Sequence, residues 1–127
     1  MIKEIINTDK APAAIGAYSQ AVKVGDTVYI SGQIPLEPIS KVIVGDQFFD
    51  QAHQVFANLN AVSEAAGGRL SDAVKLTVYV TDLANFSILN DVMSEYLQVP
   101  FPARATVQVV ALPLGALVEI DAVLCLS

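Results

Sequence analysis

The 127-residue sequence has few of the side chains that metal, redox and nucleophilic sites use. It contains one cysteine, Cys125, and one histidine, His53. A single cysteine excludes an internal disulfide and a cysteine-rich metal site, and its apolar, strand-like surroundings predict that Cys125 packs in the core. His53 has no cysteine or second histidine beside it, so we expect a solvated helix residue rather than a metal ligand. Neither a nucleophile elbow nor a dinucleotide or nucleotide phosphate loop is present.

Charged residues are also scarce. They make up 16% of the chain, compared with roughly 25% in an average soluble domain. The net charge is −6 and the seven Lys and Arg residues are scattered singly, which predicts no DNA or RNA partner. A continuous run of about 18 apolar residues, as a membrane span needs, is absent, and the N-terminus lacks a signal-peptide pattern. We therefore expect one cytoplasmic domain over residues 1–127, with no membrane contact.

Hydrophobic periodicity predicts two helices. The first covers Asp50–Ala66, with apolar residues at the i, i+3, i+4, i+7 spacing of a helix face: positions 52, 55, 56, 59, 62 and 66. Asp50 is suited to cap its N-terminus, and Gly67 and Gly68 are suited to end it. The second helix covers Asn85–Leu97 and also has an apolar stripe.

Apolar or alternating runs bounded by turn residues predict strands at residues 2–7, 19–24, 27–31, 42–44, 75–81, 104–111 and 117–126. Gly25-Asp26 is typical of a two-residue hairpin. Each helix is expected to connect two strands of one sheet. Because such crossovers are right-handed, both helices should cover the same face of an α+β sheet.

The opposite face of this sheet has few charges to solvate it. By alternation it is expected to hold many aliphatic residues together with Tyr29, Ser31, Thr77, Tyr79, Thr106 and Gln108. Left bare, it would expose an apolar patch larger than the few hundred Å² usual for monomers. The composition therefore predicts that self-association buries this face.

Arg104 and Glu119 are the residues in which we expect function. They stand at polar positions of two alternating runs that we take to be neighbouring strands. A guanidinium can bind a carboxylate through two parallel hydrogen bonds, and a partly buried glutamate can move a proton. The alternative is that Arg104 and Glu119 pair with each other or with solvent, and spacing alone favours that alternative.

Two other positions allow a functional and a structural interpretation. Gly32 follows a hydrophobic strand, where a ligand could approach its backbone closely. A plain strand-ending turn explains Gly32 equally well. Lys75 could form a Schiff base, although a solvated residue at the start of a strand is the simpler expectation.

Four segments together closely resemble the RidA (YjgF) family of enamine/imine deaminases. They occur in the family's order and intervals, and the likeness spans essentially the whole chain: Ile15–Ala21, Ile30–Pro35, Pro102–Val107 and Val118–Ala122. The resemblance implies a chorismate-mutase-like α+β fold with a mixed sheet of about six strands and two helices on one face. It also implies a homotrimer with active sites between subunits. The implied reaction is the cofactor-free hydrolysis of 2-imino acids, such as 2-iminopropanoate and 2-iminobutanoate, to 2-oxo acids and ammonia.

The resemblance also implies roles for individual residues. Arg104 would bind the substrate carboxylate, and Glu119 would activate the attacking water and return a proton to the leaving amine. Four further residues would hold the substrate. Gly32 and Thr106 would contribute backbone groups, Tyr18 would form part of the pocket wall, and Asn90 would contribute from a polar helix position.

Three positions differ from the usual pattern of the family. Thr106 stands where many deaminases of this group have cysteine, Pro38–Lys41 replaces an acidic or glycine-containing turn, and Glu95–Phe101 is a few residues shorter. Because the last loop would border the site, its length bears on the expected substrate preference more than on the reaction. The change at Thr106 matters little, because the resemblance implies a backbone contact there. Two other functions are considered: a non-catalytic or regulatory protein that binds small carboxylates, and a nuclease or translation inhibitor, which the net charge of −6 disfavours.

Overall fold

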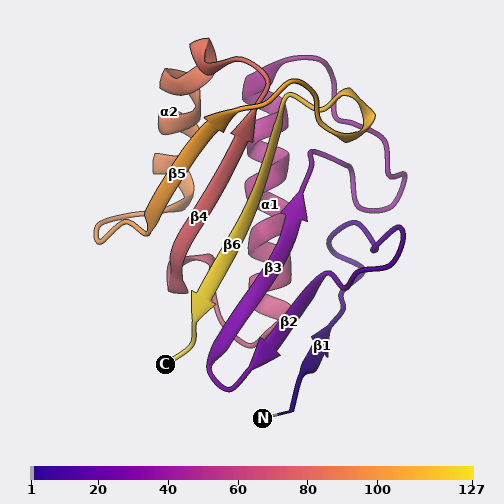
Figure 1. Ribbon diagram of the computed structural model, residues 1–127, viewed down its shortest axis with the longest axis vertical. Coiled ribbons are helices and arrows are strands. Elements are labelled where there is room, and N and C mark those ends of the chain that lie inside the picture. Colours follow the sequence, from indigo (N-terminus) through magenta and orange to yellow (C-terminus); the bar gives the residue numbers. More distant parts are fainter. Residues whose placement is uncertain (1) are drawn as a thin grey trace.

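The computed structural model describes residues 2–127, which form one six-stranded sheet with two helices behind it (Figure 1). The order of the strands in the sheet is β1-β2-β3-β6-β4-β5. Their bounds are β1 Glu4–Ile6, β2 Ala21–Val24, β3 Thr27–Gln33, β4 Ala73–Val80, β5 Ala103–Gln108 and β6 Val118–Cys125. Strands β4 and β5 pair in parallel, and the other neighbours pair antiparallel. The predicted α+β fold with a mixed sheet is confirmed.

The first hairpin forms where the sequence predicts it. Val24 pairs with Thr27 across the turn, and Gly25 has a φ of +60°, which glycine adopts at little cost. The strand predicted at residues 42–44 is wrong, because only a single bridge between Leu36 and Ile43 forms there.

Helices α1 (Phe48–Ala65) and α2 (Phe86–Tyr96) both cover the same face of the sheet, as predicted (Figure 1). Between helices and sheet lies a core whose largest fully buried side chains include Phe56, Leu59 and Ile120. Full burial of one such side chain stabilises the fold by roughly 1.5–3 kcal/mol. Among residues 2–127, no helix combines the length and the hydrophobicity that crossing a membrane requires.

For helix α1, the predicted apolar face and C-terminal end are confirmed, whereas the predicted N-terminal cap is wrong. All six predicted apolar positions are buried. Asp50 does not cap the helix, because α1 begins two residues earlier, after Gln47, and Asp50 lies in the first turn. The glycine end is confirmed: Gly67 has a φ of +90°, and the Gly68 amide donates to the Ser63 carbonyl at 3.0 Å.

The face of the sheet turned away from the helices, which we call the open face, is only partly as predicted. Tyr29 is 55% exposed there, and Tyr79 pairs with Glu119 of β6 on this side. Thr106 and Gln108 do not lie on the open face. They pair with Val78 and Val80, which are buried beneath the helices, and paired residues of adjacent strands point to the same side.

The prediction that Cys125 packs in the core is also wrong. Cys125 is exposed at the end of β6, whereas its neighbour Leu124 is fully buried. Alternation along β6 places Cys125 on the same side of the strand as Glu119, which is the open face. An apolar stretch of sequence therefore did not decide which of its members face the core.

Candidate active site

Glu119 lies on the open face of β6, between the buried residues Val118 and Ile120. Together with Tyr18 and Gly32 it lines a cavity of about 550 Å³, which we call the Glu119 cavity. Three of the six residues expected at the site thus meet in one chain.

Gly32 makes room for the Glu119 carboxylate. It lies within β3, where the register of the β3–β6 pairing shifts between Ile30 and Gln33. A Cβ atom at Gly32 would lie 2.6 Å from Oε2 of Glu119, which is closer than two such atoms can approach. The interpretation of Gly32 as a plain strand-ending turn is therefore wrong. The close approach that it permits is that of the Glu119 side chain.

The Glu119 carboxylate is half-buried and makes no hydrogen bond or ion pair with any residue between positions 2 and 127. Burial, followed by the negative charge of Asp121, raises the pKa of Glu119 above its ordinary value. Asp121 accepts a hydrogen bond from the Tyr79 hydroxyl at 3.3 Å. A carboxyl group with a raised pKa holds a proton more readily, which suits it to accept a proton and return it during a reaction.

One wall of the Glu119 cavity is a loop that Gln20 holds in place. Gln20 is 3% exposed, and its amide nitrogen donates to the carbonyls of Ala11 and Pro12 at 3.3 and 2.8 Å. Its Oε1 accepts from the amide of Thr8 at 2.7 Å. Sequence reasoning assigned no role to Gln20. In the sequence, a buried glutamine among loop residues cannot be distinguished from an exposed one, because its hydrogen-bond partners are not visible there.

Tyr18 completes this loop at the rim of the cavity. Its ring is half exposed, and its hydroxyl accepts a hydrogen bond from the amide of Ile15 at 3.1 Å. The Tyr18 hydroxyl therefore keeps its own hydrogen free to donate to a ligand.

Arg104 lies on the other side of the sheet, facing α2. Its Nη1 donates to Oδ1 of Asn90 at 2.7 Å and to Sδ of Met93 at 3.4 Å. The guanidinium carbon is 5.1 Å from the centre of the Phe86 ring, within cation–π range. Asn90, Met93, Phe101 and Arg104 line a second cavity of about 330 Å³, which we call the Arg104 pocket.

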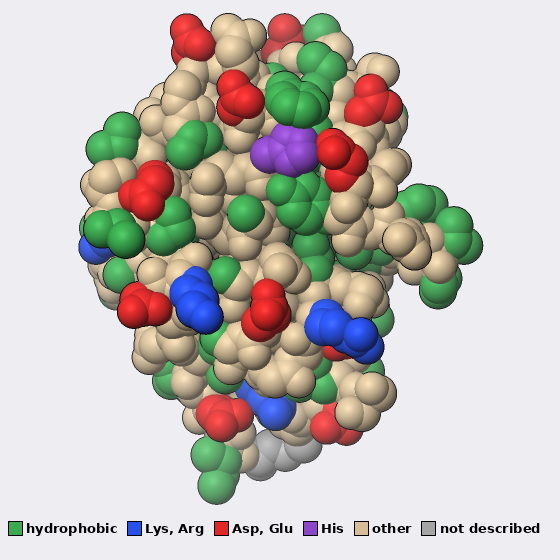
Figure 2. All heavy atoms as spheres, turned by 180° about the vertical axis from the view of Figure 1, so that it is seen from behind, with side chains coloured by type: hydrophobic (Ala, Val, Ile, Leu, Met, Phe, Trp, Pro, Cys, Tyr) green, Lys and Arg blue, Asp and Glu red, His purple; other side chains and the backbone are tan. Residues whose placement is uncertain are grey.

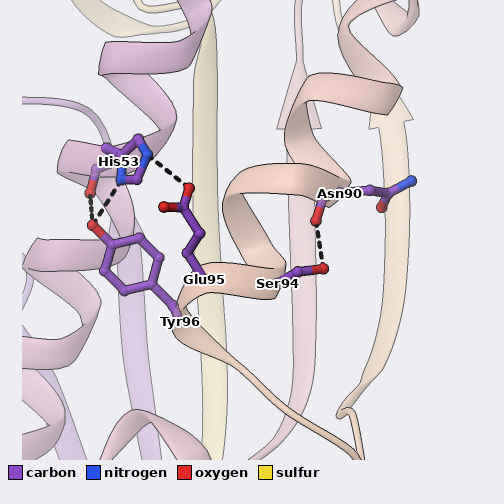
Figure 3. A network of polar contacts seen from close by, with 5 residues as sticks. All are labelled: His53, Asn90, Ser94, Glu95 and Tyr96. Carbon is purple, nitrogen blue, oxygen red and sulfur yellow. Dashed lines mark hydrogen bonds and ion pairs between the residues drawn. The ribbon is translucent and has the colours of Figure 1, made fainter.

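Asn90 and Thr106 belong to this second group. The Ser94 hydroxyl donates to the Asn90 carbonyl one turn along α2, which leaves the Asn90 side chain for Arg104 (Figure 3). Thr106 is on the same side of β5 as Arg104, and its buried Oγ1 is without a hydrogen-bond partner among residues 2–127. Strand β5 is an edge of the sheet, so part of its backbone has no strand to pair with.

Arg104 and Glu119 therefore do not meet within one chain. The prediction that they lie on neighbouring strands is wrong, because β4 separates β5 from β6. Arg104 pairs with the buried residue Leu76, and Glu119 pairs with Tyr79, so the two side chains point to opposite faces. The alternative of a mutual ion pair is wrong for the same reason.

His53 is not a freely solvated helix residue, which corrects a further expectation. Its side chain is 27% exposed and its Nε2 lies 3.1 Å from the Glu95 carboxylate. Its Nδ1 lies 3.0 Å from the Tyr96 hydroxyl, so the histidine joins α1 to α2 (Figure 3). On the helix side of the molecule the histidine is seen between hydrophobic side chains and beside an acidic one (Figure 2). The packing of α2 against α1 creates these contacts.

Comparison with known proteins adds a second line of evidence. The sequence profile of the family described as endoribonuclease L-PSP matches residues 8–125. The chain is 47% identical to a 2-iminobutanoate/2-iminopropanoate deaminase of Dermatophagoides farinae, over 98% of each protein. It is also 47% identical to the Capra hircus protein of that name, over 97% of this chain and 90% of that protein.

Two solved structures illustrate the similarity of the fold. RidA from an Antarctic Psychrobacter superposes with a TM-score of 0.94 at 54% identity, covering 97% of this chain and 99% of that chain. Escherichia coli TdcF with bound serine superposes with a TM-score of 0.92 at 39% identity, covering 98% of this chain and 99% of that chain.

Proposed function

Because the chain belongs to the endoribonuclease L-PSP family, which is the RidA (YjgF) family predicted from its four segments, we propose that it is an imine deaminase. Its substrates would be 2-imino acids, hydrolysed to 2-oxo acids and ammonia. The observation that carries the proposal is the Glu119 carboxylate, which lies half-buried at the wall of an open cavity, has a raised pKa and pairs with no cation among residues 2–127. The deaminase names of relatives at 47% identity support it.

The proposed reaction needs one carboxylate and one water. Glu119 takes a proton from the water as its oxygen bonds to the imine carbon, and the C=N double bond becomes a single bond. Glu119 then returns the proton to the nitrogen, which becomes an amino group. The proton of the new hydroxyl group passes through Glu119 to the same nitrogen, and the C–N bond breaks as the C=O bond forms and ammonia leaves. An imine is already electrophilic, so positioning plus modest acid–base assistance is sufficient.

The substrate carboxylate would bind to Arg104. Asn90 and Phe86 hold one side of the guanidinium, which leaves further N–H donors free to bind a carboxylate. Because Arg104 and Glu119 face opposite sides of the sheet, the Arg104 in question would belong to a second copy of the chain. Tyr18, Gly32 and Thr106 would hold the rest of the substrate.

We propose that this second copy comes from a homotrimer. The open face carries exposed apolar residues that a monomer would leave in water, including Ile5 at 46%, Tyr29 at 55% and Val107 at 41%. The unpaired edge β5 carries both Arg104 and Thr106. A sedimentation measurement at micromolar concentration tests the trimer, and a monomer would contradict it.

A second candidate function is binding of small carboxylates without turnover. The similarity to TdcF, solved with bound serine, favours this alternative, since serine also carries a carboxylate. A nuclease function is disfavoured by the net charge of −6 and by having only two arginines, Arg69 and Arg104.

The decisive experiment is a coupled assay in which a threonine dehydratase releases 2-iminobutanoate in the presence of the protein. The protein should accelerate the appearance of 2-oxobutanoate. Glu119→Gln should lower the accelerated rate by about 10²–10⁴-fold, as expected for loss of a positioned base. Glu64→Gln, which changes an exposed glutamate of α1, is the matched control and should keep the wild-type rate.

Arg104→Ala separates the two candidate functions further. It should abolish both acceleration and binding of 2-oxobutanoate, whereas Arg69→Ala removes the only other arginine, an exposed one, and should keep both. If 2-oxobutanoate binds to the wild type but the imine is not hydrolysed faster, the protein is a carboxylate-binding member of the family.

A further inference from the structure

In a single chain, the Glu119 cavity has more room than a three- or four-carbon imino acid fills, and in the proposed trimer Arg104 and Thr106 of the second copy would take up part of it. Its volume of about 550 Å³ lies in the range of cavities that hold drug-sized ligands. Its polar lining includes Glu119 and Tyr18. We call the five larger apolar residues that line the cavity its apolar wall: Ile15, Ile34, Leu36, Pro113 and Leu114.

The remaining polar residues at the cavity already have partners. Gln20 uses its amide to hold the loop at Ala11 and Pro12. The Ser31 hydroxyl donates to the Ser19 carbonyl at 2.6 Å, and the Gln33 amide donates to the Ser31 carbonyl at 3.1 Å. A polar group on the substrate side chain would therefore find few free partners, whereas an apolar group would displace water from an apolar wall.

Leu114 gives this wall an unusual feature. It is 67% exposed and has a φ of +57°, a left-handed conformation that leucine adopts only at a cost in free energy. Among residues 2–127, Lys41 is the one other non-glycine residue with a positive φ. A large apolar side chain that is both exposed and strained, at the edge of a cavity, indicates a binding role rather than a contribution to folding.

We propose that this protein prefers 2-imino acids with bulky apolar side chains, branched aliphatic or aromatic, over 2-iminopropanoate, and that Leu114 determines this preference. The inference rests on the proposed deaminase function and specifies its substrate class. In the bound state the imine carbon lies beside Glu119, and the substrate side chain extends along the apolar wall towards Leu114.

The test compares imines that an amino-acid oxidase releases from leucine, phenylalanine and alanine, with semicarbazide as the competing trap. The protein should give a kcat/KM for the leucine-derived imine that is about tenfold or more above that for the alanine-derived imine, because each extra methylene in an apolar pocket contributes roughly tenfold or more. Equal values, or a higher value for the alanine-derived imine, would overturn the inference while leaving the deaminase function intact.

Leu114→Asn tests the residue itself, since asparagine tolerates a positive φ and should preserve the fold. The leucine-to-alanine ratio of kcat/KM should fall by about tenfold. Lys41→Asn is the matched control, with the same φ of +57° away from the cavity, and should leave the ratio unchanged. If both variants change the ratio equally, or neither does, Leu114 does not determine specificity.

A cavity-filling variant gives an independent check. Ala13 is exposed and lines the Glu119 cavity, so Ala13→Phe should reduce the leucine-to-alanine ratio. Ala17→Phe, at an exposed position of the same loop that does not line the cavity, should not.

A binding experiment keeps the inference testable if no imine is hydrolysed faster. The proposed deaminase function would then fail, but the wild type should still bind 4-methyl-2-oxopentanoate about tenfold or more tightly than pyruvate, for the same reason of apolar contact. Equal or weaker binding of the larger acid, measured by calorimetry, would overturn the preference itself.

Discussion

The Glu119 cavity and the Arg104 pocket lie on opposite faces of the same sheet and are built in opposite ways. Arg104 is held by Asn90, Met93 and Phe86 before any ligand arrives. Glu119 has no hydrogen-bond partner within residues 2–127, and its freedom depends on the missing side chain of Gly32. The cation is preorganised, whereas the carboxylate is left unsatisfied.

This difference matches the two tasks that the proposal assigns. A group that anchors a substrate benefits from a fixed geometry, because the cost of ordering it has been met during folding. A group that moves a proton benefits from a raised pKa, which burial without a cationic partner produces. Within one chain, the opposite faces of the sheet keep the Arg104 guanidinium away from the Glu119 carboxylate, so only a second copy can bring this cation to the site.

The largest expected effect comes from mixing two inactive variants. Glu119→Gln keeps an intact Arg104 pocket, and Arg104→Ala keeps an intact Glu119 cavity. If each site takes Glu119 from one copy and Arg104 from another, about a quarter of the sites in trimers reassembled from equal amounts combine both intact residues. Such trimers should therefore regain about a quarter of wild-type activity. The measurement is the dehydratase-coupled rate after joint denaturation and refolding.

The control for this experiment mixes Glu119→Gln with the double variant that carries both substitutions, and it should regain nothing. Failure of the first mixture, with mixed oligomers demonstrated by native mass spectrometry, would show that the two halves do not meet across subunits.

Gly32→Ala should have the next largest effect. The new Cβ atom would lie 2.6 Å from Oε2 of Glu119, so the carboxylate must move. Activity should fall by roughly 10²–10⁴-fold, as for loss of the base itself. The midpoint of urea unfolding should change little, because the displaced atoms are the far end of a flexible side chain.

The double variant Gly32→Ala with Glu119→Gln sharpens this prediction. If both changes act through the same carboxylate, their effects on kcat/KM should be far from additive. Additive losses would mean that Gly32 acts on the substrate independently of Glu119.

The Glu119 carboxylate should lower the free energy of unfolding at neutral pH. Because folding raises the pKa of Glu119, the native state binds more protons than the unfolded state as the pH rises from 4.5, and the stability contributed by this residue falls. Relative to the wild type, Glu119→Gln should therefore raise the free energy of unfolding more at pH 7 than at pH 4. Urea titrations at both pH values measure this, and a lower stability of Glu119→Gln at pH 7 would contradict the assigned direction.

The smallest expected effects come from removing one hydroxyl group on each face of the sheet. Ser31 donates to the Ser19 carbonyl, so Ser31→Ala should lower the free energy of unfolding by about 1 kcal/mol. The Oγ1 of Thr106 is buried without a hydrogen-bond partner among residues 2–127, so Thr106→Val should leave the free energy of unfolding unchanged or raise it by up to about 1 kcal/mol. Thermal unfolding compares the two, and a larger loss for Thr106→Val would show that its hydroxyl has a partner in the assembled protein.

Much of the fold was predictable because it depends on local patterns. The apolar spacing of α1, the glycine that ends it and the Gly25 hairpin each follow from the residues involved. The bridge at Ile43 shows the limit, since a run of β-branched residues forms a strand only where another strand is available.

The candidate site was predictable in its residues but not in its arrangement. Tyr18, Gly32 and Glu119 were expected together and do meet. The role of Gln20 was not expected, because its partners are carbonyl groups of residues about ten positions away in the chain. The contact of Phe86 with Arg104 was equally hidden, because it depends on how α2 packs beside β5.

By itself, the sequence determined which residues alternate along each strand, where the two helices form and to which family the chain belongs. Each of these depends on short-range order in the chain. Only the tertiary structure decided which side of each strand is covered. Strand β6 inserts between β3 and β4, and pairing with Tyr79 turns Glu119 to the open face, while pairing with Leu76 turns Arg104 to the helices. The physical reason is that alternation fixes only relative sides, and the register with a neighbouring strand fixes the absolute one.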